Sequence, residues 1–371
     1  MVSSRAGLPP STVHDLPNHV LELILLRLDS SIFLVRAASA CKRWCRVVAD
    51  AGFQGHFRRR NGLRLILGHY VSRHGDAAFV PSPTIPSIYS RQSFDLDFVP
   101  MVDGSWEIAD GRGCLLFLRK RHWKKWCRRL NPDLVVCEPL TRRYRAVSVL
   151  PDMLRGCPDL GLYLLEGGAG GLSDFKFMAV LLMEHRGRGV PKACKNIPSR
   201  ASNFVFAGRA NGSLYWGIVG GGAAHAALVL DEATAGVSQV TLPDGVEGWH
   251  DGRCLRMIGG EDGGTLRAVC LIDSELRVYA RLRGGAGWVL QNLLQLLDNP
   301  IAIIASPMIV AAHEMYVLVA PKHSQWLFCV DLKTMAVERL RRRNVYKEWQ
   351  ACAYELWPPV LKISAESPRK H

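Results

Sequence analysis

The chain has 371 residues, 48% of them hydrophobic, and a formal net charge of +14 at pH 7. This length predicts more than one domain, and the hydrophobic content supports a packed core and excludes a largely disordered chain. The positive charge is compatible with nucleic acid, acidic proteins or anionic membranes as partners, but charge alone indicates neither fold nor site.

The cysteines and the apolar runs indicate the compartment. The eleven cysteines include no C-x-x-C pair, and an odd number without such pairs favours a reducing compartment over a disulfide framework. Residues 1–15 contain no apolar core of a signal peptide, and the longest apolar run, 301–312, is too short to span a bilayer. We therefore expect an intracellular protein, in the nucleus, the cytoplasm or both, with no membrane contact.

Residues 16–28 predict a helix with too much apolar surface for a single buried stripe. Pro17 is favoured in the first turn of a helix. The polar residues of this segment are only Asn18, His19, Glu22 and Arg27. A surface helix needs an apolar stripe about 100° wide. We therefore expect this helix to be buried on two sides.

Two more short helices follow. Residues 29–31 can cap a helix over 32–39, and a third helix over 40–49 has Trp44 and Val48 at helical spacing. Three helices in about 35 residues bury too little apolar area to be stable alone. The helical unit therefore needs a partner or the rest of the chain.

Residues 12–50 resemble an F-box. They contain Leu-Pro, an aliphatic helix ending in Arg-Leu, a second Leu-rich turn and Cys-Lys-x-Trp. In that family the three-helix unit binds the Skp-family adaptor of a Skp–cullin–F-box ubiquitin ligase. The resemblance implies that the adaptor-facing positions are Leu16, Pro17, Val20, Ile24, Leu28, Leu34 and Cys41. We expect the core of the unit at Leu21, Leu25, Phe33, Trp44 and Val48.

The segment departs from the F-box pattern at three positions. His19 stands where the family usually has an acidic residue, Ala40 replaces a common Val, and Asp29 stands where many members have a Pro. None of these changes removes an apolar contact larger than about two methyl groups, so we expect weaker docking at worst. Two other interpretations stay open: helices that only cap the following domain, and a DNA-binding helix-turn-helix with recognition helix 40–49.

Beyond residue 60 the sequence predicts short strands separated by turns. A strand over 134–137, the polar turn 138–141 and a strand over 144–147 form a hairpin pattern, and this pattern recurs over 227–240 and 327–340, with a weaker copy over 275–290. The copies lie about 50 residues apart, or twice that, which is typical of a β-propeller with four strands per blade.

A second signature precedes several strands. A glycine opens the strand near Gly113 and again near Gly212. Residues 313–317 occupy a comparable position relative to their own hairpin repeat. We expect the sequon 211–213 to form a turn rather than carry a glycan. The region resembles the kelch-like, F-box-associated propeller found in many plant F-box proteins.

The expected fold is mainly β with a small N-terminal α unit: a three-helix F-box followed by a β-propeller of about five or six blades. The predicted domains are a flexible lead-in at 1–11, the F-box at 12–50, a linker at 51–62, the propeller at 63–362 and a polar tail at 363–371. Two stacked β-sandwiches would show no steady period. An αβ fold is disfavoured because helical patterns are few in this region, with 289–297 the clearest.

Signatures of catalysis and metal binding are missing from the sequence. His313-Glu314 lacks the second His of a zincin, and His250 and Cys254 have no second pair near them. No Gly-Lys dipeptide and no G-x-S-x-G elbow occur. We expect no catalytic residue, no metal and no cofactor.

The densest basic run lies at 119–129. Its basic residues, which alternate with two tryptophans, are Arg119, Lys120, Arg121, Lys124, Lys125, Arg128 and Arg129. Such a run can bind nucleic acid, an acidic partner or the nuclear import machinery, or it can be a solvated loop joining the strands 113–118 and 134–137.

Together these patterns predict a non-catalytic subunit that recruits a substrate protein to a Skp–cullin–F-box ubiquitin ligase. The F-box would bind the Skp-family adaptor, and through it a cullin, while the propeller would bind a target protein. The alternative is a basic propeller that binds nucleic acid through residues 119–129.

Overall fold

The structure is a computed structural model of the whole chain. The residues that it describes are 16–28, 34, 37, 42–50, 52–53, 56–57, 65–73, 76–81, 94–100, 105–121, 134–147, 159–165, 172, 175–181, 204–218, 226–246, 254–260, 264–272, 274–281, 287–296, 307–321, 327–340 and 351–356. The chain divides into two compact units. Unit 1 contains 1–67, 84–89 and 355–371, and unit 2 contains 68–83 and 90–354.

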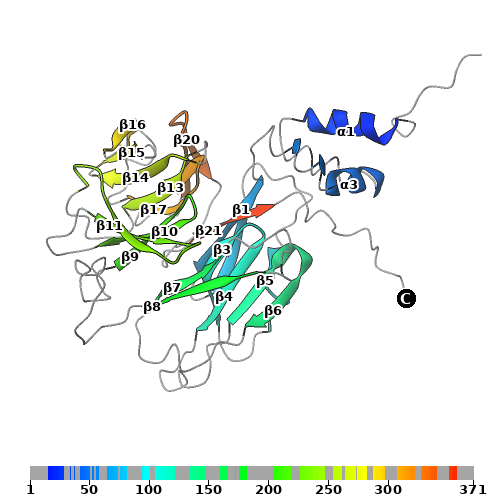
Figure 1. The fold of residues 1–371 in the computed structure, drawn as a ribbon, viewed down its shortest axis with the longest axis horizontal. Coiled ribbons are helices and arrows are strands. Elements are labelled where there is room, and N and C mark those ends of the chain that lie inside the picture. The colour runs from blue at the N-terminus through cyan, green and yellow to red at the C-terminus, as the bar shows by residue number, and fades with distance from the viewer. Residues whose placement is uncertain are drawn as a thin grey trace, which may run out of the picture. The chain divides into compact units, whose positions relative to one another are not determined.

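The described part of the N-terminal segment is helical. It contains α1 (Asn18–Leu26) and α3 (Lys42–Ala49), which contact each other and lie side by side in Figure 1. Leu34 and Ala37 are also helical, in agreement with the helix expected over 32–39, whose other residues lie outside the described part.

All other long elements in the described residues are strands. Their bounds are β1 (Leu65–Arg73), β2 (Asp76–Pro81), β3 (Ser105–Arg112), β4 (Leu115–Arg121), β5 (Leu134–Glu138), β6 (Arg143–Val147), β7 (Asp159–Leu164), β8 (Phe177–Leu181), β9 (Phe204–Ala210), β10 (Ser213–Ile218), β11 (Ala226–Asp231), β12 (Val237–Thr241), β13 (Leu255–Gly259), β14 (Leu266–Ile272), β15 (Glu275–Arg281), β16 (Val289–Gln295), β17 (Pro307–Ala312), β18 (Tyr316–Pro321), β19 (Leu327–Asp331), β20 (Val337–Leu340) and β21 (Ala351–Leu356). The expected mainly β fold is confirmed.

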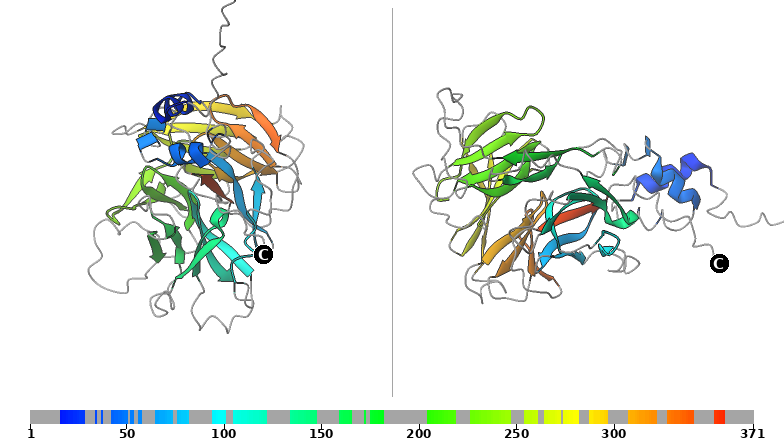
Figure 2. Two further views of the ribbon diagram at one scale, coloured as in Figure 1. Left: turned by 90° about the vertical axis from the view of Figure 1, so that its right-hand side faces the viewer. Right: turned by 90° about the horizontal axis from the view of Figure 1, so that it is seen from below.

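The strands form antiparallel sheets in chain order. Strands β3–β6, β9–β12, β13–β16 and β17–β20 each make a four-stranded meander, β7 pairs with β8, and β1 lies between β2 and β21. Figure 2 shows two further views of these strands. A parallel pairing of β9 with β13 joins two of the meanders into one eight-stranded sheet, so the described strands form five hydrogen-bonded sheets.

The first strands of successive sheets lie next to one another. Contacts run from β3 to β7, from β7 to β9, from β9 to β13 and from β13 to β17. Strand β21 lies next to β3, because a Cβ placed on Gly111 would lie 2.7 Å from the Cβ of Cys352. A series of four-stranded sheets joined through their first strands is the arrangement of a β-propeller.

The hairpin pattern expected from the repeats is confirmed in the third and fourth strands of three sheets. In each hairpin an acidic residue accepts a hydrogen bond from the hydroxyl of the threonine three residues later, and the residue after the threonine has a left-handed backbone. These triplets are Glu138, Thr141 and Arg142 (2.5 Å, φ 53°), Asp231, Thr234 and Ala235 (2.8 Å, φ 54°), and Asp331, Thr334 and Met335 (2.8 Å, φ 56°). Hydrogen bonds from the side chain and backbone of Thr234 lower the pKa of Asp231. Those from the backbone and side chain of Thr334 lower the pKa of Asp331.

The sequon also forms a turn, as expected. Asn211 and Gly212 have φ values of 49° and 73° and connect β9 to β10. Two consecutive left-handed residues are the requirement of a tight hairpin turn, and Asn-Gly meets it at the lowest steric cost.

The helical pattern over 289–297 does not correspond to a helix. Residues 289–295 form β16, the outer strand beside β15. The spacing of Leu290, Leu293 and Leu294 fits both a helix and a bulged strand. Pairing with β15 decides between them, and the register shift between Val278 and Tyr279 accommodates the irregular apolar spacing.

The core of unit 2 lies between adjacent sheets. Val269 and Val278, from the third complete meander, pack in one cluster with Val317, Phe328 and other residues of the fourth. Strands in the middle of a sheet are therefore apolar on both faces, as in β5, where all five residues are buried.

Gly208 allows β9 and β13, the first strands of two meanders, to approach closely. Its φ is 136°, and an added Cβ would lie 2.3 Å from the carbonyl oxygen of Met257, the residue with which it pairs in the parallel contact of β9 and β13. We predict that Gly208→Ala lowers the free energy of unfolding by about 2–5 kcal/mol, from backbone strain and overpacking together. Urea unfolding followed by circular dichroism measures this loss.

Gly212→Ala is the matched control. Gly212 also has a positive φ, but a Cβ there would meet nothing within 4 Å, so only the backbone cost of about 1–2 kcal/mol is expected. Equal losses in the two variants would contradict the close approach of β9 and β13.

Candidate functional site

Helix α1 has apolar side chains on two faces. Leu21 and Leu25, one turn apart, are buried, whereas Leu23 and Ile24 are 59% and 44% exposed. Side chains four residues apart lie on the same side of a helix. One apolar face is therefore covered within the protein, and another is open.

The start of α1 is well defined. Pro17 is the residue directly before the helix, and its carbonyl accepts hydrogen bonds from the amides of Val20 and Leu21, both at 3.1 Å. The fixed φ of proline suits a helix start. This places Leu16 and Pro17 beside the first turn of the helix.

Arg43 of α3 holds this start. Its Nε donates to Oδ1 of Asn18 at 2.9 Å, and its Nη2 donates to the carbonyl oxygen of Leu16. The side chain thus connects α3 to both residues that flank Pro17. Sequence reasoning missed this role, because a basic residue on α3 fits a solvated face equally well.

The structure places the predicted adaptor-facing residues as follows. Pro17 and Ile24 are exposed, Leu16, Val20 and Leu28 are half-buried, Leu34 is buried, and Cys41 lies outside the described residues. Pro17, Val20, Ile24 and Leu28 follow one another at spacings of three or four and so share one side of α1. Leu34 offers almost no surface to a partner in this arrangement.

The predicted core residues are mostly inside. Leu21, Leu25 and Val48 are buried and Trp44 is half-buried. Phe33 lies outside the described residues.

Sequence reasoning missed three further apolar residues of the helical unit. Leu23 is the most exposed apolar residue of α1, while Phe53 and Phe57 are helical, buried and stacked with their ring centroids 6.0 Å apart. The spacing of four between the two phenylalanines was a readable helical signal within the predicted linker 51–62.

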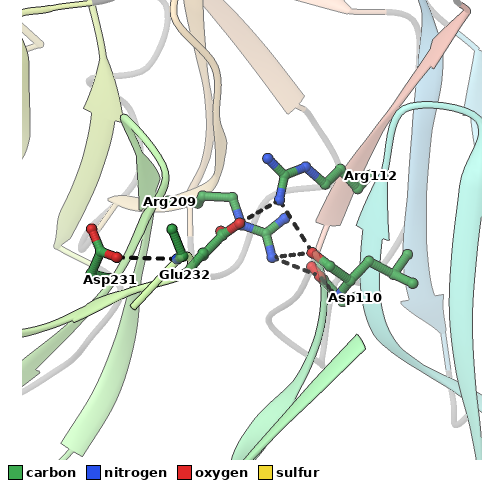
Figure 3. Close-up of polar contacts among 7 residues, drawn as sticks. Asp110, Arg112, Arg209, Asp231 and Glu232 are labelled. Carbon is green, nitrogen blue, oxygen red and sulfur yellow. Dashed lines mark hydrogen bonds and ion pairs between the residues drawn. The ribbon is translucent and has the colours of Figure 1, made fainter. Parts of the chain in front are cut away.

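Unit 2 contains a buried ion network near its inner strands (Figure 3). Arg209 of β9 lies between two carboxylates: its Nη2 is 3.1 Å from Oδ2 of Asp110, and its Nε is 2.7 Å from Oε1 of Glu232. Arg112 contacts Oε2 of Glu232 at 2.7 Å. The network thus links β3, β9 and the end of β11.

A strand of a third sheet takes part through its backbone. The amide of Leu164 in β7 donates to Asp110 at 2.7 Å, and its carbonyl accepts from Arg209 at 2.9 Å and from Arg112 at 3.3 Å. Burial raises the pKa of Asp110, although Arg209 opposes that shift. Burial would lower the pKa of Arg209, but Asp110 and Glu232 raise it above its ordinary value. These residues are already paired with one another, which indicates that the network stabilises the contact between three sheets.

The basic run divides between a strand and undescribed residues. Arg119, Lys120 and Arg121 belong to β4, so the interpretation of the run as a solvated loop does not hold for these three residues. Pairing of β4 with β3 continues to Arg121, opposite Ser105. Arg119 contacts Glu107 at 3.5 Å. The remaining basic residues, Lys124, Lys125, Arg128 and Arg129, lie outside the described part.

Among the described residues, no group of three or more His, Cys, Asp or Glu is placed to hold a metal ion. No described helix has the length and apolar character needed to cross a membrane.

Comparison with known families identifies the N-terminal segment. Residues 13–53 match the F-box-like family model. The chain carries an F-box-like domain. The matched segment includes all of α1 and α3 and extends to Phe53, three residues beyond the predicted boundary. No curated protein matches the chain.

The chain is similar in part to solved structures. The β-propeller domain of Cps50 (Swd1) from Myceliophteria thermophila is 13% identical, with a TM-score of 0.34, covering 62% of this chain and 71% of that one. AztD from Citrobacter koseri is 13% identical, with a TM-score of 0.33, covering 78% and 75%. A protein of unknown function from Desulfotomaculum acetoxidans is 10% identical, with a TM-score of 0.38, covering 79% and 100%. At these TM-scores the likeness adds no argument, and the propeller assignment rests on strand topology.

The ion network makes a prediction about stability. Arg209→Ala leaves two buried carboxylates without their shared partner, so we predict a loss of about 3–5 kcal/mol in the free energy of unfolding. Urea unfolding of the full chain measures it. Arg277→Ala, which breaks the outer pair with Glu275 at 2.6 Å, is the control and should cost much less.

A rescue variant tests the explanation. Replacing Asp110, Arg112, Arg209 and Glu232 together by apolar residues removes all four charges of the network, and it should recover much of the loss. If the quadruple variant is less stable than Arg209→Ala alone, the buried charges are not the cause.

Proposed function

We propose that this protein recruits a target protein to a Skp–cullin–F-box ubiquitin ligase. Its F-box-like domain binds a Skp-family adaptor, which connects it to a cullin, and its propeller binds the target. The observation that carries the proposal is the open apolar face of α1 within the segment that matches the F-box-like model.

The adaptor-docking face, as proposed, consists of Leu16, Pro17, Val20, Ile24 and Leu28. Leu23 extends it on the same helix. Burial of one aliphatic side chain on binding contributes about 1.5–3 kcal/mol. Several such side chains on a helix that Arg43 already orders can provide a stable contact, because little conformational entropy remains to be lost.

The protein makes no covalent bond in this mechanism. It raises the local concentration of target lysines near a ubiquitin-conjugating enzyme that the ligase brings to the same assembly. No residue of the chain is assigned a catalytic role, and no cofactor is required. The nuclear or cytoplasmic location and the kelch-like, plant F-box type of the propeller belong to the same proposal.

The described part of the basic run does not favour the nucleic-acid alternative. Arg119 contacts Glu107, and Lys120 is half-buried. Binding through 119–129 would require an affinity that falls steeply with salt and disappears when the run is neutralised.

Adaptor binding tests the proposal. The variant with Leu16→Ala, Pro17→Ala and Ile24→Asp should lose co-purification with a Skp-family adaptor, because it removes apolar contacts and places a charge in the face. The buried Leu21 and Leu25 are unchanged, so the helix should still pack, which circular dichroism checks.

Glu22→Gln is the control, since Glu22 is three or four residues away from none of the proposed docking residues and so lies on another side of α1. It should bind the adaptor as the unchanged protein does. Equal adaptor binding by all three proteins would refute the proposed docking face.

A further inference from the structure

Arg27 follows directly after α1 and continues its open apolar face. Its backbone is still helical, and its amide donates to the carbonyl of Ile24 at 3.1 Å. The amide of Leu28 donates to the carbonyl of Leu25 at 3.2 Å, so the last turn closes with bonds between residues three positions apart. Side chains three positions apart are eclipsed in such a turn. Arg27 therefore lies beside Ile24, and one turn beyond Leu23.

The side chain of Arg27 is flanked by the two most exposed apolar residues of the helix. Leu23 and Ile24 are 59% and 44% exposed, and Arg27 is exposed as well. Side chains three and four positions apart are neighbours on a helix surface. A partner that covers Leu23 and Ile24 therefore also meets the guanidinium of Arg27.

The charge of Arg27 is not neutralised within the described part of the chain. None of the described residues forms a hydrogen bond or an ion pair with its guanidinium. Glu22, the acidic residue of α1, lies 4.0 Å from His56, and its position five residues before Arg27 places it on another side of the helix. Arg43, by contrast, donates to Asn18. The cation of Arg27 is thus available to a partner.

An entirely apolar partner surface is unfavourable at this position. Contact with Leu23 and Ile24 removes water from their surroundings, and a guanidinium that loses water without gaining a partner opposes binding. A carboxylate compensates for this loss, because its two oxygens can accept two N–H groups of one guanidinium.

We propose that the adaptor surface that contacts α1 carries an Asp or Glu carboxylate opposite Arg27, within an otherwise apolar contact. This inference rests on the proposed function and adds the chemistry of the partner. Arg27 then contributes to specificity, because an adaptor without that carboxylate leaves the cation unpaired.

The alternative is a guanidinium that reaches past the adaptor into water, with only its aliphatic stem in the contact. The two arrangements differ in the result of removing the charge. Arg27→Met keeps an unbranched stem and the helix propensity but has no charge.

The test measures binding of the full chain to a purified Skp-family adaptor by isothermal titration calorimetry at low and high salt. Arg27→Met should weaken binding about tenfold at low salt, since the carboxylate of the adaptor then stays unpaired. Salt screens an interfacial ion pair, so the unchanged chain should lose affinity as salt rises, and Arg27→Met should lose clearly less. Equal or tighter binding by Arg27→Met at low salt would overturn the proposal.

Charge reversal has a matched control. Arg27→Glu should weaken binding about a hundredfold, because two carboxylates then face each other. Arg46→Glu makes the same change of charge at an exposed arginine of α3, outside the proposed docking face, and it should change binding by no more than about threefold. Circular dichroism checks that both variants keep the helices. Equal losses in the two variants would show an effect of net charge alone and would contradict a contact at Arg27.

Rescue identifies the carboxylate. The acidic residues of the adaptor are changed to lysine one at a time, and each variant is tested against Arg27→Glu. One of them should bind Arg27→Glu about tenfold more tightly than the unchanged adaptor does, which is the coupling expected of two groups in contact. If no single change restores binding, no carboxylate of the adaptor lies opposite Arg27.

The two proposals can fail separately. If the unchanged chain does not bind the adaptor, both are wrong. If the variant with Leu16→Ala, Pro17→Ala and Ile24→Asp loses binding while Arg27→Met keeps it at full strength, the docking face is supported and the carboxylate opposite Arg27 is refuted.

Discussion

The ion pair of Arg209 with Asp110 connects β9 to β3, the first strands of two four-stranded meanders, and its pair with Glu232 connects β9 to the turn after β11. A propeller sheet has apolar faces on both sides, so neighbouring sheets could slide if apolar packing alone held them. The directional contacts of Arg209, and those of Leu164 through its backbone, specify how three sheets meet.

Helix α1 presents a different constraint. A helix in so small a unit cannot bury all of its apolar side chains against two short neighbours. Leu21 and Leu25 are covered, while Leu23 and Ile24 remain open. Arg43 limits the freedom of the segment before the helix, so the open face is already shaped for a partner. The F-box-like match and the exposed face both support the proposed adaptor-binding role.

Local signals predicted the fold well. The acidic residue and threonine of each repeated turn are three positions apart, so the hairpins over 134–147, 227–240 and 327–340 could be recognised without knowledge of distant contacts. Asn211-Gly212 marked its turn for the same reason. The weaker hairpin copy over 275–290 corresponds to β15 and β16, but residues 289–297 also showed a helical pattern, because leucine spacing is ambiguous in a bulged strand and only the pairing with β15 resolves it.

Contacts between distant residues could not be predicted in this way. Arg209 and Asp110 are 99 positions apart, and Arg43 and Asn18 are 25 apart. Nothing in the local sequence of Arg209 or Arg43 distinguishes an arginine that bonds to distant residues from one that is exposed to solvent. The adaptor-facing residues were predicted largely through family resemblance. Leu23 was not among them, because the helical pattern alone does not indicate which apolar face of a short helical unit stays exposed.

Hydrogen exchange of the full chain with a purified Skp-family adaptor tests the central claim most directly. The account predicts that adaptor binding slows amide exchange over residues 16–28, where the open face of α1 becomes covered. It also predicts unchanged exchange over β13–β16, which belong to unit 2. Unchanged exchange over 16–28 in the presence of saturating adaptor, or protection confined to the propeller strands, would contradict it.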